Sequence, residues 1–541
     1  METLENPENP LLHAAAPTVV WDSGRVDSEQ SRHVPYAGVP LQPMARYRWR
    51  VRIWSAAPER AAETSSRSTG WSEPASFETG PFSHEDWGGA RWIGGAENET
   101  APLLRTGFVI DDRRAGGTSD PPRSVVRARL YFSGLGYGEP YLDGVRVGER
   151  VLDPAPTDYD RTVLFSTYDV TSLLQVPGDH VLAAMLGGGR YDEPVPNVWL
   201  WERAPWRDRP KLLAQLVIWY ADGTVQRVVT GPSWRASGGP IRSHSLYTGE
   251  LYDARQEQPG WNGVGFDDTT WAPARLMTPP RGTLRSQQLP PIMPRRVVNP
   301  IGMSSPEPGV VVYDLGEQIA GWARLRINGP AGTSVQIRYG ERLLSNGRVD
   351  IAQPHIQGEI QTDTYILRGG GDETYEPHFS YKGFQYVEVS GYPGEPSLEA
   401  LTGVVLHSAV RSTAEFDTDA EDVNRLHHGV RTALLNNLHG VPTDTPVFEK
   451  NGWTGDAHLT AEMAAYNFDL GAFWTKWLQD WVDAQLPSGE FPPIVPTPGW
   501  GYRGSEAAII APIPAWDVAY FEIPWTMYRY YGDERVLARH Y

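Results

Sequence analysis

The spacing of apolar residues changes from a period of two to a helical period near residue 412. Before that point, apolar and polar residues alternate in short segments bounded by Gly, Pro, Asp and Asn, a pattern that predicts β-strands. The clearest segments cover residues 47–54, 128–136, 320–329, 334–341 and 384–391. Strands at such short spacing favour β-sandwiches in series, and 541 residues are too many for a single core.

After residue 412, three segments show the period of amphipathic helices, at 420–438, 470–486 and 515–533, and Pro524 predicts a kink in the third. The first segment places six apolar residues on one side: Val423, Leu426, Val430, Ala433, Leu434 and Leu438. The second does the same with Phe473, Trp474, Trp477, Leu478, Trp481 and Val482. A row of tryptophans can bind sugars, but helical periodicity alone explains this one, so we interpret it as core.

The composition excludes several classes of function. The chain has no cysteine, so disulfides, thiolate catalysis and thiolate metal sites are ruled out. A formal charge of −18 disfavours binding to nucleic acid or anionic membranes. The N-terminal segment lacks the basic and apolar regions of a secretory signal, and no apolar run is long enough to span a membrane. We therefore expect a cytoplasmic protein.

The stretch PTDTPVFEKNGWTGDAH, residues 442–458, crowds three carboxylates between two helical segments. Asp444, Glu449 and Asp456 share a Pro- and Gly-rich turn with Trp453. Neighbouring carboxylates and an aromatic wall raise a carboxyl pKa, which suits the general acid of a glycoside hydrolase. The alternative is structural: Asp444 caps a turn, Asp456 caps the following helix, and Glu449 is solvated. The residues alone leave both interpretations open.

DTPVFEKNGWTGD resembles the signature of bacterial α-L-rhamnosidases of glycoside hydrolase family 78, in which Asp-Cys-Pro-Gln-Arg-Glu leads into Gly-Trp-Thr-Gly-Asp. The segment 129–171 is similar to that family's N-terminal β-sandwich. The segments 312–344, 361–370 and 375–391 are similar to its second, lectin-like sandwich, and 47–80 to its leading fibronectin-type domain. The resemblance therefore extends over nearly the whole chain.

The resemblance implies an inverting enzyme with an (α/α)6 catalytic barrel, acting on terminal rhamnose. It implies that Glu449 is the general acid, that Asp444 and Asp456 hold sugar hydroxyls, and that Trp453 is the adjacent aromatic residue. Three more pocket residues are implied less directly: Trp500, Trp516 and Asp517. The chain departs from the signature in having Thr445 for Cys and Val447-Phe448 for Gln-Arg, and the loss of that arginine leaves the preferred sugar open.

The fold class expected from these features is a tandem of β-sandwiches followed by an incomplete (α/α)6 barrel. We expect a disordered N-terminus at 1–16, a partial fibronectin-type sandwich at 17–80, the first rhamnosidase sandwich at 81–288, the lectin-like sandwich at 289–411 and part of the barrel at 412–541. The last range has room for only about half of the barrel's helices. The general base is therefore expected beyond Tyr541, and the chain is expected to be a fragment that is catalytically incomplete.

No cofactor is expected, and no histidine pair has the spacing of a metal site, although some family members bind calcium or rhamnose on the sandwich that corresponds to 81–288. LGGGRY, at residues 186–191, has neither a Walker lysine nor dinucleotide-binding spacing and is interpreted as a turn at a strand end. The expected partners are rhamnose-containing glycosides. Two other functions stay open: a carbohydrate-binding protein without catalysis, and a six-hairpin glycosidase for another sugar.

Overall fold

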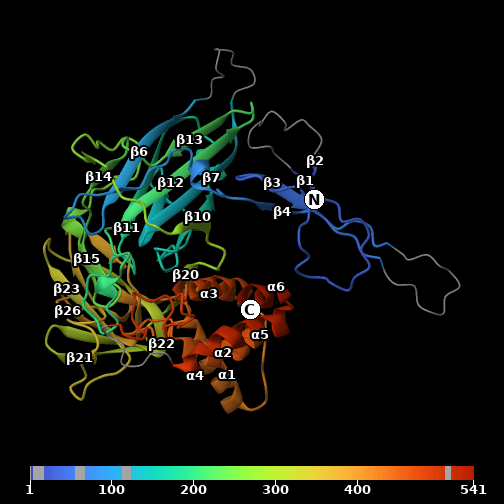
Figure 1. Cartoon of the computed structure of the whole chain (residues 1–541). Helices are drawn as coiled ribbons and strands as arrows, with labels where there is room; N and C mark the ends of the chain where they lie inside the picture. The colour runs from blue at the N-terminus through green and yellow to red at the C-terminus, as the bar shows by residue number, and fades with distance from the viewer. Residues whose placement is uncertain (1, 4–17, 55–67, 112–122, 506–512) are drawn as a thin grey trace.

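The computed structural model describes residues 2–3, 18–54, 68–111, 123–505 and 513–541. These residues form a small N-terminal sheet, two large β units and a helical unit, in chain order (Figure 1). The small sheet projects from the rest of the molecule, and the helices lie beside the two large β units. The predicted succession of β-sandwiches and then helices is confirmed, while the predicted domain boundaries stay a prediction.

The N-terminal sheet has four short strands. In order across the sheet they are β2 (Thr18–Val19), β1 (Glu2–Thr3), β3 (Arg46–Trp49) and β4 (Ala75–Glu78). The predicted disordered segment 1–16 lies outside the described residues, apart from the two residues of β1. The strand predicted at 47–54 is shorter in the structure, where β3 ends at Trp49.

The first large β unit is a sandwich of a seven-stranded and a six-stranded sheet. The seven-stranded sheet runs β18 (Arg275–Leu276), β5 (Ile93–Gly94), β12 (Lys211–Tyr220), β7 (Val125–Leu135), β10 (Thr162–Asp169), β19 (Thr283–Ser286), with β13 (Val225–Val229) also paired to β12. The six-stranded sheet runs β17 (Ala272–Pro273), β14 (Arg235–Ser237), β6 (Leu103–Ile110), β11 (Gly178–Gly187), β8 (Tyr137–Leu142), β9 (Val145–Arg146).

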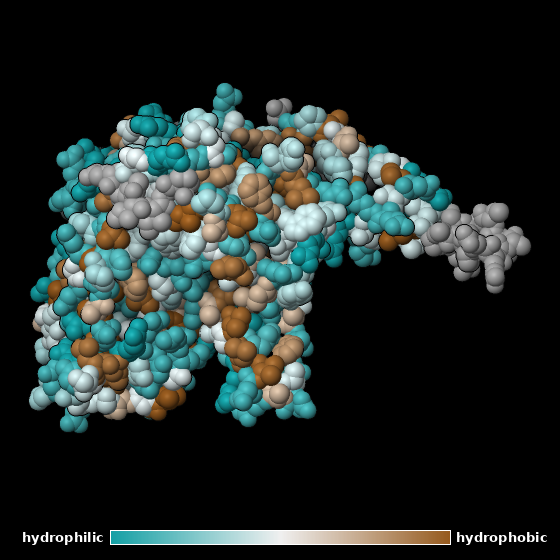
Figure 2. Space-filling model, turned by 60° about the horizontal axis from the view of Figure 1, so that its bottom comes forward, coloured by the Kyte–Doolittle hydropathy of each residue, from teal (hydrophilic) through white to brown (hydrophobic). Residues whose placement is uncertain are grey.

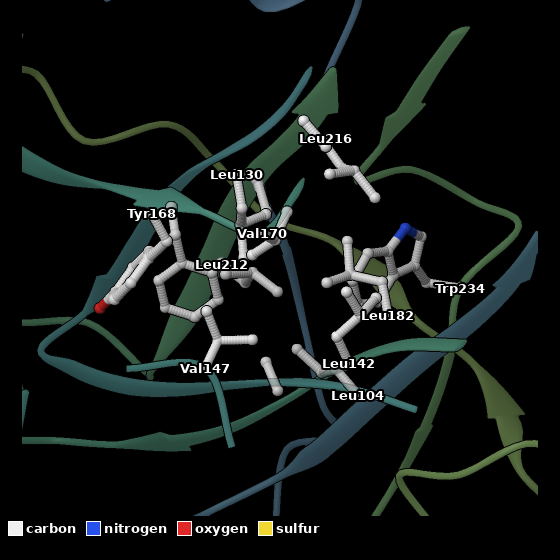
Figure 3. Packing of buried hydrophobic residues seen from close by; sticks show 14 of the residues in the cluster. Leu104, Leu130, Leu142, Val147, Tyr168, Val170, Leu182, Leu212, Leu216 and Trp234 are labelled. Atoms are coloured by element: carbon white, nitrogen blue, oxygen red, sulfur yellow. The ribbon is translucent and has the colours of Figure 1, made fainter. Parts of the chain in front are cut away.

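The core of this sandwich lies between the two sheets (Figure 3). Leu130 and Leu212 of the first sheet face Leu104 and Leu182 of the second, and Trp234 closes one side of the cluster without exposed surface. Alternation along each strand sends every second side chain into this layer. Burying each large apolar side chain contributes about 1.5–3 kcal/mol, so the layer holds the two sheets together.

The second large β unit is built on a ten-stranded sheet. Its main path is β15 (Ile241–Ser245), β16 (Gly249–Asp253), β24 (Thr362–Ile366), β23 (Ser334–Gly340), β26 (Lys382–Ser390), β22 (Val310–Asn328), β27 (Leu401–Ser408), β20 (Ile292–Val298), and both β21 (Gly302–Glu307) and β25 (Asp372–Tyr375) pair with β22. Strands β15 and β16 come from the range predicted for the first sandwich, and β16 pairs in parallel with β24. The ten-stranded sheet therefore takes strands from both sides of residue 288.

The helical unit contains α1 (Glu421–Leu435), α2 (Thr454–Asn467), α3 (Gly471–Ala484), α4 (Pro514–Asp517), α5 (Ala519–Tyr531) and α6 (Glu534–His540), and a short pair, β28 (Arg411–Ser412) with β29 (Phe468–Asp469). The break in the third predicted helix comes at Val518, and Pro524 lies inside α5. The segment predicted as one helix is thus divided before Ala519, and the kink predicted at Pro524 stays a prediction.

The tryptophans of α3 are core residues, as predicted: Trp474, Trp477 and Trp481 have no exposed surface. The apolar side predicted for α1 behaves differently. Only its C-terminal end is buried, while Leu426 keeps 69% of its surface exposed. Among the described residues, little therefore covers the first turns of α1.

Figure 2 shows another face of the molecule, on which apolar residues are interspersed with polar ones. None of the described helices is long and apolar enough to cross a bilayer. The cytoplasmic location expected from the sequence stays a prediction.

Candidate active site

The predicted carboxylates lie in the connection between α1 and α2. Asp444 and Glu449 belong to the connecting loop, Trp453 occupies the N-cap position of α2, and Asp456 is an exposed residue of its first turn. The helix begins at Thr454, so Asp456 does not cap it as the structural alternative supposed. A carboxylate in the first turn nevertheless faces the positive end of the helix dipole.

The loop is closed by a reciprocal pair of hydrogen bonds. The backbone amide of Asn451 donates to Oδ1 of Asp444 at 2.9 Å, and the amide of Asp444 donates to the carbonyl of Asn451 at 3.1 Å. Lys450, which directly precedes Asn451, has a left-handed backbone (φ 54°). Its buried ammonium donates to the carbonyl oxygens of Leu246 at 2.5 Å and Tyr381 at 2.6 Å. Asp444 is thus a structural part of the loop that carries Glu449.

The first β unit holds the same loop from the other side. Arg190, 5% exposed, donates to the carbonyl of Lys450 and, at 3.5 Å, to that of Glu449. Its other terminal nitrogen donates to the hydroxyl of Tyr247 at 2.6 Å. The indole N–H of Trp201 donates to Oδ1 of Asn451 at 2.9 Å. Unpaired buried carbonyls cost about 1–3 kcal/mol each, so these contacts set the position of the loop.

Glu449 contacts an aromatic cluster. The indole N–H of Trp453 donates to its Oε2 at 2.6 Å. Trp500, 8% exposed, packs edge-to-face against Trp453 with a centroid distance of 5.7 Å. The Glu449 side chain is half-buried, so its carboxyl lies between an aromatic wall and solvent. This position suits a group that must bind a sugar and exchange a proton with it.

The electrostatics favour protonated carboxyls. Burial, reinforced by the negative charge of Glu449, raises the pKa of Asp444 to about 8. Burial also raises the pKa of Glu449, against the opposing effects of the Trp453 hydrogen bond and of nearby His355. Burial raises the pKa of Asp456 as well. Asp444 holds its proton most firmly, but its Oδ1 is engaged by the loop backbone, whereas Glu449 is presented at the surface of the site.

The two remaining predicted residues, Trp516 and Asp517, have different neighbours. Trp516 of α4 packs on the first turn of α2, where a β-carbon added to Gly455 would lie 2.6 Å from the indole ring. Asp517 follows it, and burial together with the charge of Glu490 raises the pKa of Asp517 to about 6. Trp516 therefore lies against the helix turn that follows the carboxylate loop, whereas the charge that acts on Asp517 is that of Glu490.

Sequence reasoning did not identify Arg190, Tyr247, Trp201 or His355 as parts of the site. Arg190 lies in the LGGGRY segment, directly after β11, so the segment is a strand-end turn as predicted and also carries the loop's anchor. The position of Arg190 directly after three glycines was the available sequence signal that this arginine contacts the loop. Within the described residues, no group of three or more histidine or carboxylate side chains is arranged to hold a metal ion. The expectations about calcium and other cofactors stay predictions.

Comparison with known proteins follows the same division of the chain. Four family models match: a Rha78A-like N-terminal immunoglobulin domain at residues 11–83, the α-L-rhamnosidase N-terminal domain at 123–296, the bacterial α-L-rhamnosidase concanavalin-like domain at 304–407 and its 6 hairpin glycosidase domain at 411–541. The leading domain expected to be fibronectin-type is thus similar to an immunoglobulin domain. Together the matches cover most of the chain.

Relatives named as α-L-rhamnosidases are similar over most of this chain. One from Streptomyces avermitilis is 39% identical over 87% of the chain and 44% of its own length. One from Formosa agariphila is 32% identical over 96% of the chain and 56% of its own length. The chain therefore spans about half the length of these curated relatives.

Solved structures agree. The α-L-rhamnosidase structure from Dictyoglumus thermophilum superposes with a TM-score of 0.86 at 36% identity, covering 100% of this chain and 58% of that one. A Streptomyces avermitilis α-L-rhamnosidase, solved with L-rhamnose, gives 0.82 at 30% identity, covering 97% of this chain and 64% of that one. On the domain matches, the relatives and these structures together, the chain belongs to the family of bacterial α-L-rhamnosidases.

Proposed function

We propose that the protein is a glycoside hydrolase that removes terminal α-L-rhamnose from rhamnosides, with Glu449 as the general acid. The observation that carries this proposal is the geometry of Glu449. Its carboxyl accepts a hydrogen bond from the Trp453 indole at 2.6 Å, and its pKa is raised. The pKa values of the neighbouring Asp444 and Asp456 carboxyls are raised as well. The sugar class is supported by the relatives named as α-L-rhamnosidases and by the one solved with L-rhamnose.

In the proposed reaction, protonated Glu449 gives its proton to the glycosidic oxygen while the bond from that oxygen to the anomeric carbon breaks. Water attacks the anomeric carbon from the opposite face, which inverts its configuration, and a second carboxylate takes the proton that water loses. We assign no residue of this chain to that second carboxylate. Asp444 and Asp456 are proposed to bind sugar hydroxyls, and Trp453 with Trp500 to supply the apolar wall.

Two further residues belong to the proposal with less direct support. Trp516 is proposed to extend the aromatic wall, because it packs on the first turn of the helix that follows Trp453. Asp517 is proposed as a polar pocket residue beside it. Calcium on the first sandwich is kept as a separate proposal, without an assigned site.

The test is release of nitrophenol from p-nitrophenyl α-L-rhamnoside by the protein. The Glu449→Gln variant should lose about 10²–10⁴-fold in activity, because general acid catalysis contributes that much. Glu462→Gln is the matched control, since Glu462 lies exposed on α2 and bonds to Tyr530. Equal activity of the two variants would contradict the role of Glu449.

Three other results would contradict the function itself. Hydrolysis of a different aryl glycoside, with none of the rhamnoside, would indicate a glycosidase for another sugar. Binding of L-rhamnose without hydrolysis would indicate a carbohydrate-binding protein. Release of sugar with retained configuration, followed by NMR of the fresh product, would contradict inversion.

A further inference from the structure

A histidine of the second β unit lies beside the carboxylate loop. His355 belongs to the segment 341–361, which joins β23 to β24. Its ring lies between two others: the centroid is 5.7 Å from that of Trp199 at an interplanar angle of 26°, and 5.4 Å from that of Phe448 at 2°. Phe448 directly precedes Glu449. Rings from three parts of the chain thus form one stack next to the proposed acid.

The backbone around His355 is held firmly. The carbonyl of His355 accepts from the amide of Val198 at 3.0 Å, and Ile356 forms a β-bridge with Asn197. The side-chain oxygen of Gln353 accepts from the amides of His355 at 2.7 Å and Ile356 at 2.9 Å. These hydrogen bonds fix the backbone that carries the imidazole, and ring stacking positions the imidazole itself.

The charges that face Glu449 come from every neighbouring element. Asp444 lies on its own loop and Asp456 on α2, and both are acidic. Arg190, from the first β unit, contacts the backbone carbonyl of Glu449. His355, from the second β unit, lowers the pKa of the Glu449 carboxyl against the effect of burial.

This arrangement gives Phe448 a role. The family signature has an arginine at this position, so Phe448 replaces a cation near the carboxylates. In the structure, the Phe448 ring lies flat on the imidazole of His355.

We propose that His355 is a positioning residue of the Glu449 site, which fixes the Phe448–Glu449 segment by ring stacking and places a basic ring beside the loop that carries Glu449. This inference rests on the proposed function and deepens it. The imidazole favours the ionised form of Glu449, whereas the charge of Asp456 opposes it. Removing the imidazole charge therefore makes Glu449 take up its proton at higher pH.

The experiment measures the titration of Glu449 directly, by carboxyl carbon NMR of protein labelled at glutamate, with Glu449→Gln identifying the signal. His355→Phe keeps an aromatic ring in the stack and removes the charge, and His355→Asn removes the charge by a second route. Both should move the Glu449 midpoint to higher pH. The matched control, His428→Asn, removes a histidine that is exposed on α1 and should leave the midpoint unchanged.

A midpoint that stays in place in both His355 variants would overturn the proposal, because a purely structural ring would give that result with His355→Phe. The NMR readout needs no turnover, so it is independent of the rhamnosidase assay. If Glu449→Gln has full activity while the His355 variants move the midpoint, the proposed function fails and the His355–Glu449 coupling stands. If the midpoint does not move while Glu449→Gln is inactive, the reverse holds.

Discussion

Replacing Gly455 by alanine tests whether Trp516 belongs to the site. Gly455 is buried in the first turn of α2, and a β-carbon there would lie 2.6 Å from Cε2 and 2.7 Å from Cδ2 and Nε1 of the Trp516 indole. An indole ring is rigid, so Trp516 or the whole of α4 must move to make room. Overpacking of this kind costs about 1–3 kcal/mol.

The clash works against a gain that alanine normally brings to a helix. Alanine is more favourable than glycine in a helix interior by about 1 kcal/mol. The net expectation for Gly455→Ala is therefore a loss of about 0–2 kcal/mol in the free energy of unfolding, combining the overpacking cost and the helix gain.

Gly429 provides the matched control. It is exposed in the middle of α1, and no atom of the described residues lies within 4 Å of a β-carbon built there. Gly429→Ala should therefore stabilise the helical unit by about 1 kcal/mol. The Gly455→Ala protein is predicted to be less stable than the Gly429→Ala protein by about 1–3 kcal/mol, which is the overpacking cost.

Urea denaturation, followed through the helical circular dichroism signal and extrapolated linearly to water, measures both changes. The Gly455→Ala variant should also weaken binding of L-rhamnose if Trp516 forms part of the pocket wall. If Gly455→Ala stabilises the protein as much as Gly429→Ala does, Trp516 does not pack on α2, and its place in the site is refuted.

Two further predictions concern buried charge. Asp444→Asn keeps an oxygen acceptor for the Asn451 amide and removes a group whose pKa is raised from 3.8 to about 8. A raised carboxyl pKa gives stability that is present below about pH 4 and lost as the pH rises towards 8, so the variant should gain stability relative to wild type across that window. Parallel pH profiles of unfolding for the two proteins would contradict this. Lys382→Met should cost about 3–5 kcal/mol in urea denaturation, because it leaves buried Asp363, 2.6 Å from the ammonium in wild type, without a counter-charge. The double variant with Asp363→Asn should recover much of that loss, and a small effect of the single change would show that the pair is not isolated from solvent.

Local patterns in the sequence were enough for the secondary structure of most of the chain. Strand and helix are set by the alternation of side chains along a few consecutive residues, and this is visible without knowledge of their partners. The segments 334–341 and 384–391 match β23 and β26 within a few residues, and the α3 tryptophans are core as their spacing predicted. The exposed side of α1 shows the limit of the same reasoning, since periodicity marks an apolar face but not what covers it.

The candidate site likewise has two kinds of residues: those that are close together in the sequence and those that come from other units of the fold. Asp444, Glu449, Trp453 and Asp456 are close in sequence, so a single turn brings them together and a motif reveals them. The groups that hold and tune that turn come from other units of the fold. Arg190 is separated from the Lys450 carbonyl by 260 positions, and His355 reaches the loop from another sheet. Contacts of this kind depend on how sheets and helices pack against one another, and no local pattern encodes that packing. The sequence by itself therefore identified the carboxyl proposed to do the chemistry, and only the tertiary structure decided which arginine, histidine and aromatic rings surround it.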